Sequence, residues 1–146
     1  MVVTIDTNII YQSIRSSSGA SHKIVQMVRQ GEIRLALSNS VLTEYEAVLL
    51  RQSSLEAFKL SNDDILKVLR LIAFVSDKFA PSFLFRPNLK DEDDNIFVEL
   101  AVVSQSNYLI TNNLKDYRNS ELKFNCFKVI TPSDFLREWR KYCGKK

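Results

Sequence analysis

The chain has few of the residues that most often mark zinc or nucleophilic chemistry. Its 146 residues include one histidine, His22, and two cysteines, Cys126 and Cys143. Zinc sites and serine–histidine–acid catalysis need histidine or thiolate groups in defined clusters, so the sequence argues against both. Two cysteines build no disulfide framework, and we therefore predict a reducing, cytoplasmic compartment.

Long apolar runs and linker-like segments are also scarce. No run approaches the ~20 apolar residues that span a bilayer, and no basic segment followed by an apolar one opens the chain. We therefore expect neither a membrane segment nor a secretory signal. Three glycines and three prolines leave little material for linkers. We predict a single domain over residues 1–146, with a basic C-terminal tail at about 137–146.

Short apolar segments alternate with amphipathic ones along the chain. Predicted strands lie at 2–6, 33–37, 108–113 and 127–131. Predicted helices begin near Thr7, near residue 21 with Gly31 after its end, and near residues 38, 61, 91 and 131. Apolar strands separated by helices are typical of a parallel sheet covered by helices, so we predict an α/β sandwich.

Acidic residues occur where these predicted strands end. Asp6 directly follows the first strand, and Asp116 follows the strand at 108–113. Glu44 lies in the helix after the second strand. The segment DEDDN opens a further helix with Asp91, Asp93 and Asp94. The carboxyl ends of parallel strands share one edge of a sheet, where ligands usually bind, so these acids are predicted to approach one another.

Carboxylates gathered at one edge repel one another unless a cation lies between them. Oxygen ligands without histidine or thiolate favour Mg²⁺ or Mn²⁺ over zinc. A metal held in this way activates water and offsets the charge of a phosphodiester in hydrolysis. The pattern therefore suggests metal-dependent phosphodiester hydrolysis.

Each acid also has an ordinary structural explanation. The aspartates of DEDDN are favourable at a helix N-terminus, Asp116 suits a turn, and Glu44 suits a solvated helix face. Asp6 is the exception, because a carboxylate directly after a buried strand is costly unless it is paired or ligated. Asn8 argues against a haloacid-dehalogenase-type phosphatase, which needs an aspartate two residues after its nucleophile.

Four segments in order carry a resemblance to a known family: VTIDTNII, SNSVLTEYEAVL, DEDDNIFVELAVVSQSNYLITNNLKDY and VITPSDFL. They resemble the PIN-domain ribonucleases, and within that family the toxin branch of bacterial toxin–antitoxin systems, which is VapC-like. The third segment is the most specific, because it combines aspartates, a helix, an apolar strand and then Thr-x-Asn followed by an aspartate. The resemblance implies a three-layer α/β/α sandwich around a parallel sheet of about five strands.

The resemblance also implies an Mg²⁺- or Mn²⁺-dependent endoribonuclease and assigns its residues. The implied catalytic and metal-binding acids are Asp6, Glu44, Asp94 and Asp116. The implied supporting residues are Asn8, Thr111 and Asn113, with Asp91 as an outer metal residue. Asp91 and Asp93 are also rivals for the position of Asp94.

The implied partners are an RNA substrate, a cognate antitoxin and a second copy of the chain, with no membrane. Cations expected near RNA are Arg15, Lys23, Lys90, Lys115, Arg118, Arg137, Arg140, Lys141, Lys145 and Lys146, each of which also suits a solvated surface. Tyr11 and Tyr117 suit either base stacking or ordinary packing. Self-association is expected on the helices at 41–51 and 63–76. The alternative function is a catalytically inactive RNA- or antitoxin-binding module.

Overall fold

The computed structural model describes residues 1–80, 92–118 and 126–144, and the side chains of residues 92–95 are outside this description. Five strands form its sheet: β1 (Val2–Ile5), β2 (Arg34–Leu37), β3 (Asp77–Lys78), β4 (Tyr108–Ile110) and β5 (Lys128–Ile130). Their order across the sheet is β3-β2-β1-β4-β5, and every pair is parallel. The predicted parallel sheet of about five strands is confirmed.

The position of β1 decides where a site can form. From β1 the chain first adds β2 and β3 on one side, and later adds β4 and β5 on the other. The strand order therefore reverses between β1 and β4, where Ile5 lies opposite Ile110. In sheets of this kind, the crevice at such a switch point, beyond the carboxyl ends of the strands, is the usual place for a ligand.

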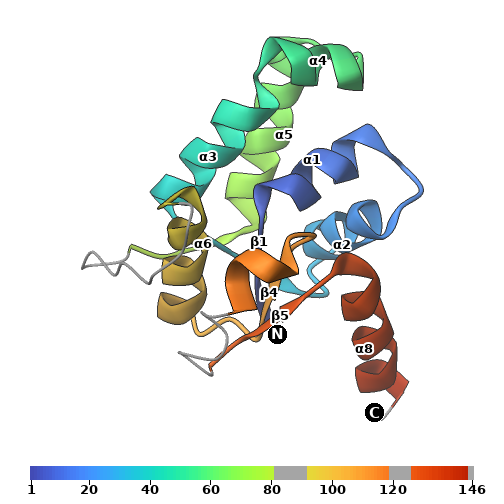
Figure 1. Ribbon diagram of the computed structural model, residues 1–146. Coiled ribbons are helices and arrows are strands. Elements are labelled where there is room, and N and C mark those ends of the chain that lie inside the picture. The colour runs from blue at the N-terminus through green and yellow to red at the C-terminus, as the bar shows by residue number, and fades with distance from the viewer. Residues whose placement is uncertain (81–91, 119–125, 145–146) are drawn as a thin grey trace.

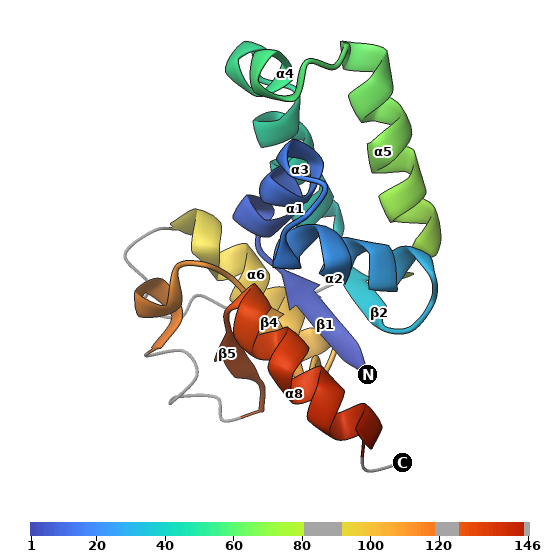
Figure 2. The ribbon, with the colours of Figure 1, turned by 90° about the vertical axis from the view of Figure 1, so that its right-hand side faces the viewer.

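Helices cover both faces of the sheet (Figure 2). On one face lies α6 (Glu92–Val103), and on the other lie α2 (Ala20–Arg29) and α8 (Pro132–Gly144). Beyond the carboxyl ends of the strands, α3 (Asn39–Leu49), α4 (Gln52–Phe58) and α5 (Asn62–Val75) form an extension next to α1 (Thr7–Arg15) (Figure 1). The predicted three-layer α/β/α arrangement is thereby confirmed.

Local sequence signals set several of these helix ends. Ser61 and Asp64 form a reciprocal capping box at the start of α5. Ser38 caps α3 by accepting from the Val41 backbone N–H. Gly31 follows the end of α2 with a φ of +77°, a conformation that glycine adopts without strain. These ends agree with the sequence-based prediction.

Other elements differ from the prediction. The cap of α1 is Asp6 and not Thr7, because the Asp6 carboxylate accepts from the first helical N–H. Strand β3 and helix α4 were not predicted, since β3 is two polar residues long and α4 only seven residues. Residues 137–144 of the expected basic tail belong to α8.

The core is apolar and continuous between the sheet and its helices. Ile5, Leu109 and Ile110 are fully buried at the carboxyl half of the sheet, together with Ile9 of α1 and Val98 of α6. Such packing holds the ends of β1 and β4 in fixed relative positions. In the part of the chain that the structure describes, no helix is long and apolar enough to cross a membrane.

Candidate active site

Asp6 lies at the switch point, between the last residue of β1 and the first residue of α1. Its backbone N–H donates to the Ile110 carbonyl over 3.0 Å and so continues the β1–β4 pairing. Its Oδ1 accepts from the Thr7 backbone N–H at 2.7 Å. The backbone at Asp6 is extended, as an N-cap requires. The transition from strand to helix therefore holds a carboxylate at the edge of the core, where only 5% of the residue is exposed.

Three further donors converge on the second oxygen of this carboxylate. Asp6 Oδ2 accepts from Thr111 Oγ1 at 2.7 Å, from Asn8 Nδ2 at 3.2 Å and from the Tyr117 hydroxyl at 3.3 Å. Thr111 and Tyr117 are themselves fully buried. A carboxylate with this many partners has a fixed orientation, which is a property of functional sites as well as of structural ones.

Tyr117 does not have the base-stacking role that the sequence allowed. A ring that is fully buried cannot stack on a base of a bound nucleic acid. Instead, its hydroxyl donates a hydrogen bond to Asp6 Oδ2. Tyr11 is half-buried and packs against Phe58, with ring centroids 4.9 Å apart. Neither ring therefore supports the stacking interpretation.

The loop after β4 is folded around Thr111. The Thr111 hydroxyl accepts from the Asn113 backbone N–H at 3.0 Å, and the Asn113 carbonyl accepts from the Asp116 N–H at 3.1 Å. Asn8 Oδ1 accepts from the Asn112 N–H at 3.4 Å, which ties the loop to α1. These bonds lead the chain into a short helical segment at 114–118 that carries Asp116. The side chain of Asn113 itself is exposed.

The electrostatics of Asp6 show that a second acid is near it. Burial raises the pKa of the Asp6 carboxyl above its ordinary value. Hydrogen bonds from Thr111, Thr7 and Tyr117 oppose this effect by favouring the ionised form. The negative charge of Asp116 acts in the same direction as burial and raises the pKa further. The fold therefore brings Asp6 and Asp116 together, although 110 positions separate them in the sequence.

Of the remaining predicted acids, only Glu44 has a described side chain. Glu44 is half-buried on α3, one residue before Tyr45, whose hydroxyl donates to the Ile5 carbonyl at the end of β1. Asp93 and Asp94 lie in the first turn of α6, but their side chains are outside the described part of the chain. Asp91 is also outside the described residues.

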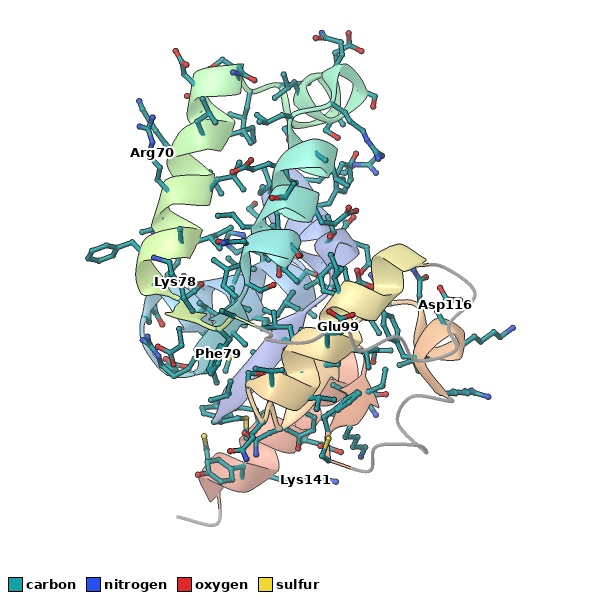
Figure 3. The ribbon with its side chains drawn as sticks, turned by 90° about the vertical axis from the view of Figure 1, so that its left-hand side faces the viewer. Arg70, Lys78, Phe79, Glu99, Asp116 and Lys141 are labelled. Carbon is teal, nitrogen blue, oxygen red and sulfur yellow. The ribbon has the colours of Figure 1, made fainter. Side chains whose placement is uncertain are left out.

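Glu99 is a buried acid that sequence reasoning did not single out. It lies on α6, is 8% exposed, and has an interaction partner. Figure 3 shows it on the side of the molecule where Asp116 also lies, nearer the middle of α6. The sequence signal that could have identified Glu99 is its position as the one carboxylate within the otherwise apolar run Ile96–Val103. Such a residue is expected either at a site or in a buried pair.

The donor groups around Asp6 are consistent with a hard cation. The Asp6 carboxylate and the Thr7 and Thr111 hydroxyls offer oxygen atoms there, and Oδ1 of Asp6 has a single described partner, which leaves acceptor capacity for a cation. The Thr7 hydroxyl next to it is buried and has no hydrogen-bond partner among the described residues. An unsatisfied buried hydroxyl beside a buried carboxylate suits a site that holds water or an ion.

The described acids do not complete such a site by themselves. Within residues 1–80, 92–118 and 126–144, no group of three histidine, cysteine or acidic side chains is close enough to hold a metal ion. The side chains of the predicted acids Asp91, Asp93 and Asp94 lie outside the described part of the chain. The oxygen donors present therefore fit Mg²⁺ or Mn²⁺ as part of a ligand set.

Histidine and cysteine take no part in this arrangement. His22 is half-buried on α2, and its Nδ1 lies 3.1 Å from the Ser13 carbonyl of α1. It thus connects two helices. Cys126 and Cys143 are exposed and not bonded to each other. Zinc chemistry therefore has no support among the described side chains.

Comparison with known proteins agrees with this geometry. A family model described as PIN domain matches residues 2–115. Among solved structures, a chain in the crystal structure of VapBC2 from Rickettsia felis, bound to a DNA fragment from their promoter, is similar with a TM-score of 0.57. The match has 15% sequence identity and covers 90% of this chain and 98% of that one. No curated protein sequence matches the chain significantly.

Proposed function

Because the chain belongs to the PIN-domain family, we propose that it is an endoribonuclease that depends on Mg²⁺ or Mn²⁺. PIN domains are generally nucleases, and the family model covers residues 2–115, a stretch that includes Asp6, Glu44 and Asp94. The observation that carries the proposal is the buried carboxylate of Asp6 at the switch point of the sheet, with four donors on it and Asp116 beside it.

The proposed chemistry divides between the metal and the protein. When bound, Mg²⁺ or Mn²⁺ would strengthen water as a nucleophile and offset the charge that develops on the phosphate. Asp6 would bind the cation through its less occupied oxygen, Oδ1. Thr111, Asn8 and Tyr117 would keep that carboxylate ionised and oriented. Asp116, exposed at the mouth of the site, would accept the proton of the attacking water or complete the ligand set.

The other proposed acids are Glu44 and Asp94. Glu44 lies on α3 and Asp94 in the first turn of α6, and both would add carboxylates to the ligand set. Figures 2 and 3 show the start of α6 and the segment at 114–118 at the same edge of the sheet. Asp91 or Asp93 would substitute for Asp94 if the first turn of α6 presents a different residue. Asn113 acts through its backbone in the described loop.

A role as the toxin of a toxin–antitoxin pair is part of the proposal. It is supported by the similarity in fold to a chain of VapBC2. The proposed partners are an antitoxin protein, an RNA substrate and a second copy of the chain. The proposed location of the protein is the cytoplasm. On α5, Phe74 is 85% exposed and Leu71 is 40% exposed, so self-association is proposed there. The chain would act as one domain.

An RNA-cleavage assay tests the proposal directly. The wild-type chain should cut single-stranded RNA with Mg²⁺ or Mn²⁺ and lose this activity in EDTA. Asp6→Asn and Asp116→Asn should each reduce kcat by about 100-fold or more, because removing one charge-stabilising group typically costs that much. Asp63→Asn, an exposed aspartate on α5, is the matched control and should cleave normally.

Two outcomes would separate the proposal from its alternative. Full metal-dependent cleavage by Asp6→Asn would refute the assigned site. Binding of RNA and of metal without any cleavage would favour an inactive RNA-binding module. Adding a purified candidate antitoxin to the active enzyme then tests the toxin role, since inhibition is expected if the antitoxin occupies this edge of the sheet.

A further inference from the structure

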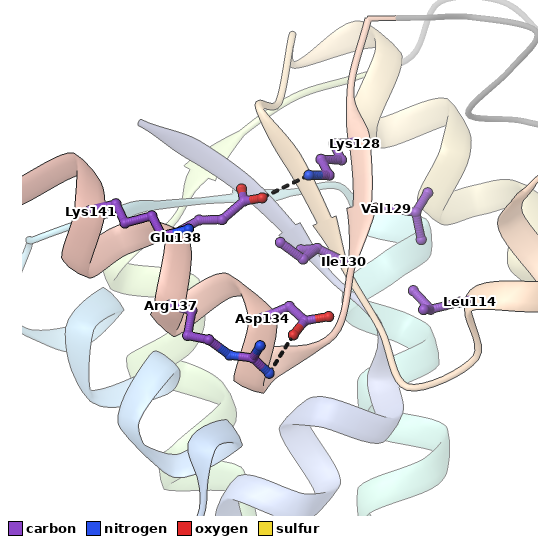
Figure 4. Close-up of a pocket in the computed structure, with 8 residues that line it drawn as sticks. All are labelled: Leu114, Lys128, Val129, Ile130, Asp134, Arg137, Glu138 and Lys141. Carbon is purple, nitrogen blue, oxygen red and sulfur yellow. Dashed lines mark hydrogen bonds and ion pairs between the residues drawn. The ribbon is translucent and has the colours of Figure 1, made fainter.

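The described surface carries two pockets beside α8 with different charge. The pocket between β5 and α8 has a volume of about 230 Å³ and is shown in Figure 4. There Lys128 pairs with Glu138 and Arg137 with Asp134, each at 2.7 Å. Opposite charges within hydrogen-bond distance largely neutralise each other, and with Lys141 the lining has three cations against two anions, so its net charge is small.

The second pocket lies between the start of α2 and the start of α8. Its volume is about 530 Å³, and no acidic residue lines it among the described residues. Its cations are Lys23 on α2 together with Arg137 and Arg140 on α8. Lys23 and Arg140 are exposed and form no ion pair with any described side chain, whereas Arg137 is shared with Asp134. Two helices therefore contribute uncompensated positive charge to one cavity.

Hydrogen-bond donors accompany these cations. Ser18 and Ser133 line the same cavity with their hydroxyl groups. Gly19, the N-cap residue that precedes α2, has no side chain that could cap the helix, so the first backbone N–H groups of α2 have no side-chain cap from it. Phosphate oxygens accept from both kinds of donor and are attracted by both cations. A ligand without several acceptor oxygens would use fewer of these donors and cations.

Both walls of the pocket are connected along the chain to residues of the candidate active site. Thr111, which donates to Asp6, also donates its backbone N–H to the Ile130 carbonyl at the end of β5. Ser133 of the pocket lies three residues further along the chain. On the other wall, α1 leads from Asp6 through the loop at 16–19 into α2. The elements that position Asp6 therefore lead directly into both walls of the pocket.

From these observations we propose that the pocket between α2 and α8 binds a backbone phosphate of the RNA substrate, away from the bond that is cut. Lys23 and Arg140 provide the charge, and Ser18 and Ser133 provide neutral donors. This inference rests on the proposed ribonuclease function and adds the place where the substrate strand is held. The contact is to the backbone, so it positions RNA without reading its sequence.

The test measures RNA binding and cleavage with matched charge variants. Binding of a fluorescein-labelled single-stranded RNA is followed by anisotropy in EDTA, over 50–200 mM KCl. For the double variant Lys23→Ala/Arg140→Ala, loss of two phosphate contacts should lower the salt slope by about 1.4 and weaken binding about 25-fold at 0.1 M salt. In the cleavage assay KM should rise by a similar factor, with kcat unchanged.

Two further variants serve as controls. Lys67→Ala/Arg70→Ala removes two exposed cations from α5, where Arg70 projects away from the body of the molecule (Figure 3), and should bind RNA like the wild type. Lys23→Arg/Arg140→Lys keeps both charges and should retain most of the affinity. Thermal unfolding of all variants checks that they remain folded.

Each outcome has a defined meaning. Wild-type affinity in Lys23→Ala/Arg140→Ala would overturn the pocket while leaving the ribonuclease proposal intact. An equal loss in the α5 control would also overturn it, because the effect would then come from net charge alone. A wild-type chain that neither binds nor cuts RNA would overturn the proposed function and this inference together.

Discussion

Replacing Thr111 with valine tests how strongly the interior supports the carboxylate of Asp6. Valine has nearly the same shape as threonine but lacks the hydroxyl, which donates to Asp6 Oδ2 at 2.7 Å and accepts from the Asn113 N–H at 3.0 Å. A hydrogen bond to a charged group contributes about 1.5–3 kcal/mol and a neutral one about 1 kcal/mol. We expect Thr111→Val to lower the free energy of unfolding by about 3 kcal/mol at neutral pH.

The pH dependence of this loss identifies its cause. Apart from the opposing effect of burial, the Thr111 hydroxyl has the largest influence on the pKa of Asp6, and it favours the ionised form. The loss in Thr111→Val should therefore be complete at neutral pH. It should shrink as the pH falls through the folded-state pKa of Asp6, which burial raises above its ordinary value of 3.8. What remains in acid is the bond to Asn113, about 1 kcal/mol.

Urea unfolding of the wild type and the variant, from about pH 7 down to about pH 4, measures this difference. Thr4→Val is the matched control, because Thr4 is also fully buried but pairs with the neutral Ser106 hydroxyl at 2.9 Å. Its loss should be about 1 kcal/mol and independent of pH. A loss in Thr111→Val that is the same at both ends of the series would refute the reasoning.

Three further predictions concern other parts of the fold. Glu138→Gln removes the anion to which Lys128 and Tyr108 donate, contacts that hold the pKa of Glu138 below its ordinary value of 4.5. The variant should be less stable by about 1 kcal/mol at neutral pH. This difference should vanish as the pH falls below 4.5 and through the folded-state pKa of Glu138. Urea titrations at several pH values measure it. Phe74→Glu should convert a dimer into a monomer in sedimentation experiments while changing stability by less than about 0.5 kcal/mol; a monomeric wild type would contradict the proposed interface. Ser61→Ala removes the capping hydroxyl of α5 and should lower the free energy of unfolding by about 1 kcal/mol, measured by chemical denaturation, whereas unchanged stability would argue against the capping box.

The main architecture could be predicted because its signals are local. Apolar runs such as Val2–Ile5 form strands wherever both faces are covered, and residues such as Ser61 and Gly31 act on the backbone directly next to them. The two-residue strand β3 has no such signal, since Asp77 and Lys78 are polar and pair only because β2 offers them a free edge.

In the candidate site, too, some features follow from local sequence signals and others do not. The place of Asp6 follows from the sequence, since a carboxylate directly after a buried strand must lie at the carboxyl edge of a parallel sheet. The support of Asp6 by Tyr117 does not, because the two residues are 111 positions apart and Tyr117 reads as an ordinary aromatic. The burial of Glu99 likewise depends on which face of α6 meets the sheet.

What the sequence determined by itself is therefore the class of the fold, the order of its main elements and the place of Asp6 at the carboxyl edge of the sheet, all of which depend on periodicity and residue type. Tertiary structure alone decided which distant side chains share a place: Tyr117 donates to Asp6, the charge of Asp116 acts on Asp6, and Lys23 and Arg140 line one pocket. Contacts between distant positions depend on how helices pack on the sheet, and that packing is a sum of many small interactions that no single segment encodes.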